Sequence, residues 1–339
     1  MNKYTFTMIT LLACNALQAT TPYITKVWEY RPAPGQFVNL MPVYEEGDDA
    51  ATMCQKAEQA IANNAQSMIC LGSWGGYVVF SFDHPIVNSK GNYDFIVHGN
   101  AFNGSSEPGI VCVSYDANGN GLPDDTWYEL AGSAHSDAKT IKNYQVTYTR
   151  PAASHVPTPN LDDQPQLIDT THVKWADNKG NTGYIMQLSF HEQPYYPQWI
   201  PEEKMVFSGT RLPDNGAFNA EKKMYVQTAF DYGYVDNLPN KNENAKLKIS
   251  WAVKSNGTAA NLPAVHFVKV YTGVHQQFYG TTGETSTEIK GAQDLHPDMP
   301  TDLWNTDYNV SKPAKIMQNG QVYILRPDGT YNLYGVKIE

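Results

Sequence analysis

The stretch DANGNGLPDDTWYE at residues 116–129 brings oxygen-bearing side chains to alternate positions around two Asn-Gly pairs. Its order resembles the opening of an EF-hand loop, where a hard cation takes about six to eight oxygen ligands and a glycine permits the sharp turn. The spacing predicts a structural calcium site. The predicted ligands are Asp116, Asn118, Asn120, the carbonyl of Leu122, Asp124, Asp125 and Glu129.

The stretch departs from a standard EF-hand at its twelfth position, where Trp127 replaces the bidentate glutamate. Asp125 or Glu129 would have to supply that carboxylate, and strands rather than helices are expected on both sides. The alternative is a β-turn in which Asn-Gly supplies positive φ and the acids are solvated. A catalytic role is disfavoured because solvated loop acids lack the environment that raises one pKa of a working pair.

Two segments combine aromatic rings with residues that could leave them open to a ligand: GSWGGYVVF at 72–80 and PYYPQW at 194–199. Glycines let a ligand approach closely, and prolines stiffen a loop so that binding costs little entropy. The alternatives are a turn whose tryptophan packs on the core and a loop anchored by its own aromatic residues. The candidate ligand-binding residues are Trp74, Tyr195, Tyr196, Trp199 and a nearby loop histidine, His191.

Several classes of function are disfavoured. No HExxH, paired CxxC, GxSxG or P-loop motif occurs, and no two carboxylates can be named that would face one another across a cleft. The net charge of −10, from 24 basic and 34 acidic residues, argues against nucleic-acid binding. We therefore expect a binding protein rather than an enzyme.

The elements that must position these residues are mainly strands. Residues 47–64 predict one helix, capped by Asp48 or Asp49 and burying the face of Met53, Ala57, Ala60 and Ile61. Short apolar or alternating segments follow, separated by turn residues, which predicts a mainly β, antiparallel sandwich of jelly-roll type. The expected strands are 77–82, 93–99, 109–115, 126–132, 144–150, 184–190, 223–235, 246–253 and 265–274, with long irregular insertions at 151–182 and 191–222.

Both ends of the chain differ from this body. Residues 1–19 resemble an export signal cut after Ala19, although LLAC could instead be a lipobox that leaves Cys14 lipidated. Residues 20–300 are expected to form the ligand-binding sandwich, 301–313 a linker, and 314–339 a small β tail. Cys54, Cys70 and Cys112 would then remain, either with a Cys54–Cys70 bridge or as buried free thiols. No later segment is apolar enough to predict a transmembrane span.

Three blocks of sequence resemble a known family: WGGYVVFSFDHPIVN, YDFIVHGNAFNGSSEPGIVCVSYDANGNGLPDDTWYELAGS, and VHFVKVYTGVHQQFYGTTGETSTEIKGAQDLH. They are similar to exported Bacteroidetes "cell surface proteins", some described as PKD-domain-like, over residues 23–300. The final block, KIMQNGQVYILRPDGTYNLYGVKIE, resembles the sorting tails of type IX secretion. The resemblance implies a protein that is exported to the cell surface or outer membrane, or secreted.

Members of this family tend to be encoded beside TonB-dependent receptors of vitamin B12 uptake. The resemblance therefore implies capture of a cobamide (vitamin B12) for outer-membrane uptake, with a TonB-dependent receptor as partner. It implies no particular ligand residues in this chain. The alternative function is a carbohydrate-binding or adhesion module that holds a glycan through the same aromatic rings and has a structural calcium site.

Overall fold

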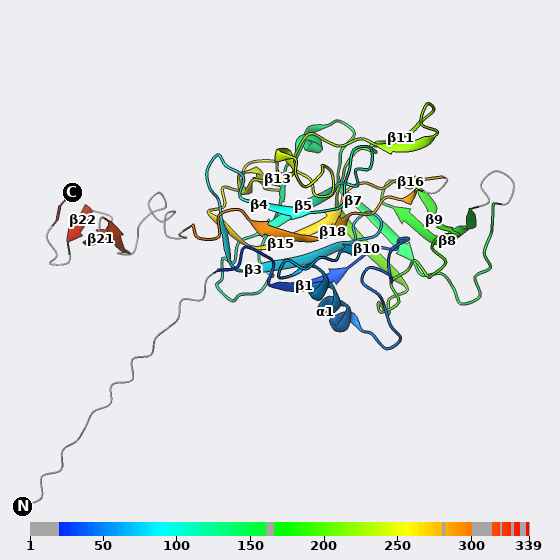
Figure 1. Ribbon diagram of the computed structural model, residues 1–339, viewed down its shortest axis with the longest axis horizontal. Helices are drawn as coiled ribbons and strands as arrows, with labels where there is room; N and C mark the ends of the chain where they lie inside the picture. The colour runs from blue at the N-terminus through cyan, green and yellow to red at the C-terminus, as the bar shows by residue number, and fades with distance from the viewer. Residues whose placement is uncertain are drawn as a thin grey trace, which may run out of the picture.

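A computed structural model describes residues 20–160, 166–279, 282–299, 314–318, 321–326, 329–332 and 337–338. The chain is mainly β, with 40% strand and 8% helix, and its strands pair antiparallel in several sheets. One α-helix occurs in the described residues (Figure 1). The predicted fold class, an antiparallel β-sandwich with one N-terminal helix, is therefore confirmed.

Two sheets dominate the body (Figure 1). In spatial order, the six-stranded sheet contains β1 (Lys26–Arg31), β3 (Tyr77–Val87), β15 (Ala264–Thr272), β5 (Gly109–Ser114), β6 (Trp127–Leu130) and β14 (Ala252–Val253). The four-stranded sheet contains β10 (Lys204–Arg211), β7 (Ile141–Thr149), β8 (Leu167–Asp177) and β9 (Thr182–Leu188).

Smaller pairings complete the fold. One sheet contains β13 (Lys246–Leu247), β4 (Phe95–His98) and β19 (Gly291–Asp294). Three sheets have two strands each: β11 (Gly216–Asn219) with β12 (Met224–Gln227), β16 (Gln277–Phe278) with β17 (Gly283–Glu284), and β18 (Glu288–Ile289) with β2 (Ile69–Cys70). The C-terminal sheet contains β20 (Ala314–Gln318), β21 (Gln321–Arg326) and β22 (Gly329–Asn332). Short 3-10 turns lie at Ser133–Ser136, Glu243–Ala245 and Ile249–Trp251.

Aromatic side chains fill the space between the two large sheets. The Trp74 ring lies edge-on to Tyr144 of β7 at 4.8 Å and to Tyr271 of β15 at 6.3 Å between centroids. The hydroxyl of Tyr148 donates to the carbonyl oxygen of Trp74 at 3.0 Å. Phe207 of β10 also contacts Tyr148. These contacts join both sheets into one hydrophobic core, as expected for sheets that pack face to face.

The helix α1 (Ala50–Ile61) covers the side of β1 (Figure 1). Asp49 caps it, since its carboxylate accepts a hydrogen bond from the backbone N–H of Thr52 at 2.8 Å. The buried face is Met53, Ala57, Ala60 and Ile61, as predicted.

Three expected segments differ from the structure. The insertions 151–182 and 191–222 are not wholly irregular, because β8 and the start of β9 lie in the first, and β10 and β11 lie in the second. Polar residues on β8 obscure its alternation in the sequence. The expected strand 223–235 is reduced to β12, and 246–253 is broken by a 3-10 turn.

Other expectations concern the thiols and the ends of the chain. Cys54, Cys70 and Cys112 are all free thiols, so the alternative of a Cys54–Cys70 bridge is wrong. Among the described residues, no helix is long and apolar enough to cross a membrane. The export signal and Cys14 lie outside the described residues. In the tail, β20, β21 and β22 form one sheet, and Tyr331 of β22 also bridges to Lys337.

Candidate functional site

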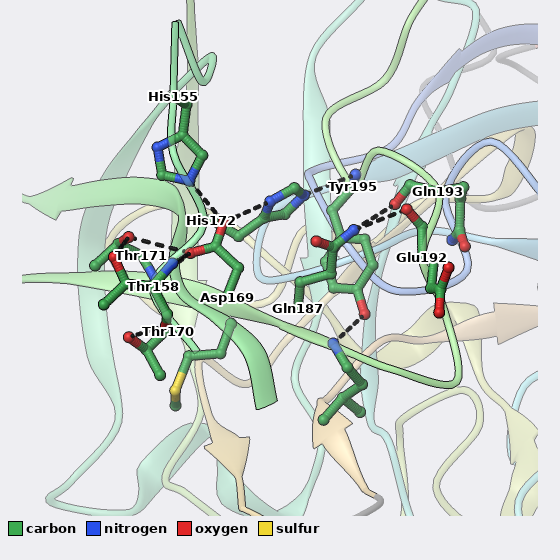
Figure 2. Close-up of polar contacts among 12 residues, drawn as sticks. His155, Thr158, Asp169, Thr170, Thr171, His172, Gln187, Glu192, Gln193 and Tyr195 are labelled. Atoms are coloured by element: carbon green, nitrogen blue, oxygen red, sulfur yellow. Dashed lines mark hydrogen bonds and ion pairs between the residues drawn. The ribbon is translucent and has the colours of Figure 1, made fainter. Parts of the chain in front are cut away.

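A carboxylate on β8 holds two histidines where the long loops of the four-stranded sheet meet (Figure 2). Asp169 and His172 both come from β8, and His155 comes from the loop that follows β7. Three residues apart, two side chains of a regular strand point to opposite faces. Here the pairing of β8 with β9 is irregular on both sides of Asp169, and these bulges let both side chains face the same loop.

Asp169 is fully buried and fully hydrogen-bonded. Its Oδ2 lies 2.6 Å from Nε2 of His155 and 3.2 Å from Nδ1 of His172. Its Oδ1 accepts from the backbone N–H groups of Thr158 at 3.1 Å and Thr171 at 3.0 Å. Burial alone would raise the pKa of this carboxyl, but the hydrogen bonds outweigh it and lower the pKa to about 2. The group is therefore a fixed negative charge at neutral pH.

The surroundings of His172 define its protonation. The backbone N–H of Tyr195 donates to Nε2 of His172 at 3.4 Å, so Nε2 is an acceptor and the proton lies on Nδ1, which faces Asp169. Burial lowers the pKa of His172 against the opposing effect of Asp169, which favours this neutral form.

His155 is held differently. Its Nε2 lies 2.6 Å from Oδ2 of Asp169, and among the described residues no group bonds to its Nδ1. The side chain is 24% exposed. A carboxylate behind an imidazole orients the ring, as it does for histidines that ligate metals.

The three side chains could offer a metal ion three donor atoms, all within 4.8 Å of one another. Two imidazoles and one carboxylate form a donor set typical of zinc, with bonds of about 2.0–2.2 Å. Binding at Nδ1 of His172 would move its proton to Nε2, which already faces the N–H of Tyr195. This arrangement is better suited to two imidazoles hydrogen-bonded to one carboxylate than to a resident metal.

A pocket of about 360 Å³ lies beside this cluster. The guanidinium group of Arg150 stacks over the ring of Tyr196 at 4.3 Å on one wall and also donates to the carbonyl oxygen of Ile200. We call this space the histidine pocket. Its lining residues are Arg150, Pro151, Ala152, His155, His172, Gln187, Glu192, Pro194, Tyr195, Tyr196 and Gln198.

The predicted calcium loop is an exposed connection between β5 and β6. Asp116 accepts from the backbone N–H groups of Gly119 at 2.7 Å and Gly121 at 2.9 Å, and both glycines have a φ of 72°. The amides of Asn118 and Asn120 donate to Asp124 at 3.2 and 3.0 Å. The loop thus gathers these oxygens around a turn, and calcium binding stays a prediction.

Three other predicted ligands of this loop lie as follows. Asp125 faces the loop, because it accepts from the backbone N–H of Ala117 at 3.1 Å. Leu122 is exposed at the turn and donates its N–H to the side chain of Asn120. Glu129 is not brought to the loop: its carboxylate accepts from the hydroxyls of Tyr271 at 2.6 Å and Thr210 at 2.7 Å.

The prediction that the aromatic rings are exposed is wrong. Trp74 and Tyr195 are 0% exposed, Tyr196 is 1% exposed and Trp199 is 6% exposed. The glycines beside Trp74 serve packing, because a Cβ on Gly75 would lie 2.4 Å from Phe207. Both alternatives stated above, a tryptophan packed on the core and a loop anchored by its own rings, are confirmed.

The loop rings pack against neighbours from other segments. Trp199 stacks on Tyr30 at 5.8 Å, and the hydroxyl of Tyr195 accepts from the backbone N–H of Leu188 at 3.1 Å. His191 packs edge-on against Phe37 at 4.6 Å and does not line the histidine pocket. Of the predicted ligand-binding residues, only Tyr195 and Tyr196 line the histidine pocket.

The sequence does not reveal His155, Asp169 and His172 as a cluster. Asp169 follows His155 by 14 positions, and no fixed spacing links them. The one available signal was the position of both histidines in the insertion 151–182, where functional loops are common.

A comparison of the chain with protein-family models finds no match, and a search of curated proteins finds none either.

Proposed function

We propose that this protein is a non-catalytic binding protein of the cell envelope that captures a cobamide at the histidine pocket. One observation carries the proposal: His155 lines an open pocket with an Nδ1 that no described residue bonds, while Asp169 holds its Nε2. The cobalt of a cobamide accepts an imidazole nitrogen as an axial ligand. The resemblance to exported proteins encoded beside vitamin B12 receptors supplies the ligand class.

The size of the pocket limits how the ligand is held. Ligand pockets that enclose a drug-sized molecule have volumes of about 300–1,000 Å³. A cobamide is larger than such molecules, so a space of about 360 Å³ takes one part of it while the corrin lies across the rim. Arg150 at the rim is suited to the amide and phosphate oxygens of the ligand.

Trp74 and Trp199 are buried and do not contact the ligand in this binding mode. The protein is exported to the cell surface in this proposal, and it delivers its ligand to a TonB-dependent outer-membrane receptor.

Titration calorimetry and absorption spectroscopy test the proposal with aquocobalamin, cyanocobalamin and cobinamide. Aquocobalamin is expected to bind with a shift of its corrin absorption bands, because His155 displaces its labile water. Cyanocobalamin is expected to show a smaller shift, because its cyanide is held more tightly. The variant His155→Gln is expected to lose the shift and at least tenfold in affinity, about 1.4 kcal/mol.

His191→Gln is the matched control, since His191 lies in a neighbouring loop and packs on Phe37 outside the pocket. It is expected to bind as the wild type does. No heat with any of the three corrinoids at micromolar protein would overturn the proposal, and an unchanged spectrum with normal heat would remove the role of His155.

A further inference from the structure

A second open pocket, of about 450 Å³, lies beside β6, the start of β7 and the turn after β14. Trp127, Glu129, Lys142, Asn143, Thr210 and Lys254 are among its lining residues. We call it the Trp127 pocket. It shares no lining residue with the histidine pocket.

Glu129 forms a rigid acceptor at this pocket. Hydroxyl groups of Tyr271 and Thr210 donate to its two oxygens at 2.6 and 2.7 Å, and the ring of His135 lies 3.5 Å away. Burial opposes ionisation, but the nearby His135 ring and the hydrogen bonds from Tyr271 and Thr210 together lower the pKa of Glu129 to about 2. The side chain is 23% exposed, so part of this fixed carboxylate is accessible from the pocket.

The walls offer polar groups that have no partner among the described residues. Among the described residues, no hydrogen bond is made by the indole N–H of Trp127, the side-chain amide of Asn143 or the ammonium group of Lys254. Trp127 is half-buried and thus presents an apolar ring beside these donors and acceptors. A ligand can satisfy several of them at once.

The charges favour a neutral ligand. The ammonium group of Lys142 lies 3.6 Å from Glu129 and donates to Thr210 at 3.3 Å, so it offsets the carboxylate. Lys142 and Lys254 would repel a cationic ligand, and Glu129 would repel an anionic one. Polyols combine hydroxyl donors and acceptors with apolar C–H faces that stack on aromatic rings.

We propose that the Trp127 pocket binds a neutral saccharide, with the sugar face on Trp127 and its hydroxyls on Glu129, Lys142 and Asn143. The role is binding and not hydrolysis, because Glu129 is the only carboxylate among the described residues that line the pocket, and glycoside hydrolysis requires a pair. This inference does not rest on the cobamide proposal, since site and ligand class both differ.

A glycan array followed by calorimetry with the best glycan tests the inference on the full chain. Trp127→Ala and Lys142→Ala are each expected to reduce affinity at least tenfold, while Trp127→Phe, which keeps an aromatic face, loses much less. Trp251→Phe is the control, because Trp251 packs on Tyr93 and Tyr232 outside the pocket.

Melting temperatures of all variants separate lost binding from lost folding. Lys142 is 49% exposed, so its replacement keeps the test valid even where Trp127→Ala fails to fold. An array without binding overturns the inference, as does glycan binding that survives both alanine substitutions. Cobamide binding should be unchanged in Lys142→Ala, which separates failure of this inference from failure of the proposed function.

Discussion

Three carboxyl groups meet in the protein interior, and they should make stability fall as pH rises. Oxygens of Glu107, Asp236 and Glu288 lie within 4.8 Å of one another, with Asp236 and Glu288 buried. Burial, followed by the charges of its neighbours, raises the pKa of Glu288 well above its usual range. Burial also raises the pKa of Glu107 to about 8 and that of Asp236 to about 7.

The sign follows from proton binding. A carboxyl whose folded pKa is raised keeps its proton in the folded state after the unfolded chain has lost it. Its stabilising contribution is complete below the unfolded pKa, about 4.3 for a glutamate, and declines as pH rises toward the folded value. Each such group costs up to about 1.4 kcal/mol per pH unit between its unfolded and its folded pKa. For Glu288 the window from about pH 6.5 to pH 8 is informative, because a glutamate in the unfolded chain is already ionised there.

The variant Glu288→Gln isolates this effect, because glutamine is neutral at every pH and can still accept from the Ser286 hydroxyl, 2.7 Å from Glu288 in the wild type. Urea unfolding in EDTA, at several pH values, gives the free energy of unfolding of both proteins. The stability of the variant relative to the wild type is expected to increase with pH across this window, by up to about 1.4 kcal/mol per pH unit. Titrating groups that do not interact with Glu288, including the histidines, cancel in this difference, whereas Glu107 and Asp236 interact with Glu288 and contribute to it.

Glu243→Gln is the control, since Glu243 is exposed and pairs with Lys246 at 2.8 Å. Its difference from the wild type should be nearly independent of pH. A Glu288→Gln difference that stays constant within about 0.5 kcal/mol from pH 6.5 to pH 8 would refute the reasoning.

Three further outcomes are expected. Chelation with EDTA should lower the melting temperature, and Asp116→Ala should reproduce the loss, because a bound calcium stabilises only the folded loop; an unchanged melt would make residues 116–129 an ordinary turn. Asp169→Asn should lower the free energy of unfolding by about 1.5–3 kcal/mol in urea, since it removes charge-assisted bonds from both histidines. Trp74→Ala should cost about 3–5 kcal/mol in the same assay, because the ring fills the space between the two sheets.

The features that could be predicted from the sequence are those that local patterns encode. The helix and its buried face follow from the helical spacing of apolar residues, and its N-terminal cap follows from the capping chemistry of Asp49. The strands that alternate or run apolar, such as β5 and β15, were predicted close to their bounds. β8 was missed because its inward side chains include Asp169, whose burial depends on hydrogen bonds from another loop.

Exposure of aromatic residues could not be predicted in the same way. Proline and glycine around Trp74 or Trp199 are compatible with a ring that faces solvent and with a ring packed under its own loop. Burial of these rings depends on partners that are distant in sequence, since Tyr144 lies against Trp74 and Tyr30 lies against Trp199. The polar clusters were missed for the same reason, since no spacing rule joins His155 to Asp169 or Glu107 to Glu288.

The two pockets lie near opposite ends of one strand, so we expect binding at one pocket to be independent of binding at the other. Lys142 near the start of β7 lines the Trp127 pocket, and Arg150 just past its end lines the histidine pocket. At about 3.4 Å per residue, the segment between them spans about 27 Å. Substitutions so far apart without shared partners combine additively within about 0.5 kcal/mol. The variant that combines Lys142→Ala with His155→Gln should therefore lose both ligands, each by the factor of its single variant, and a larger or smaller combined loss would indicate that β7 couples the two sites.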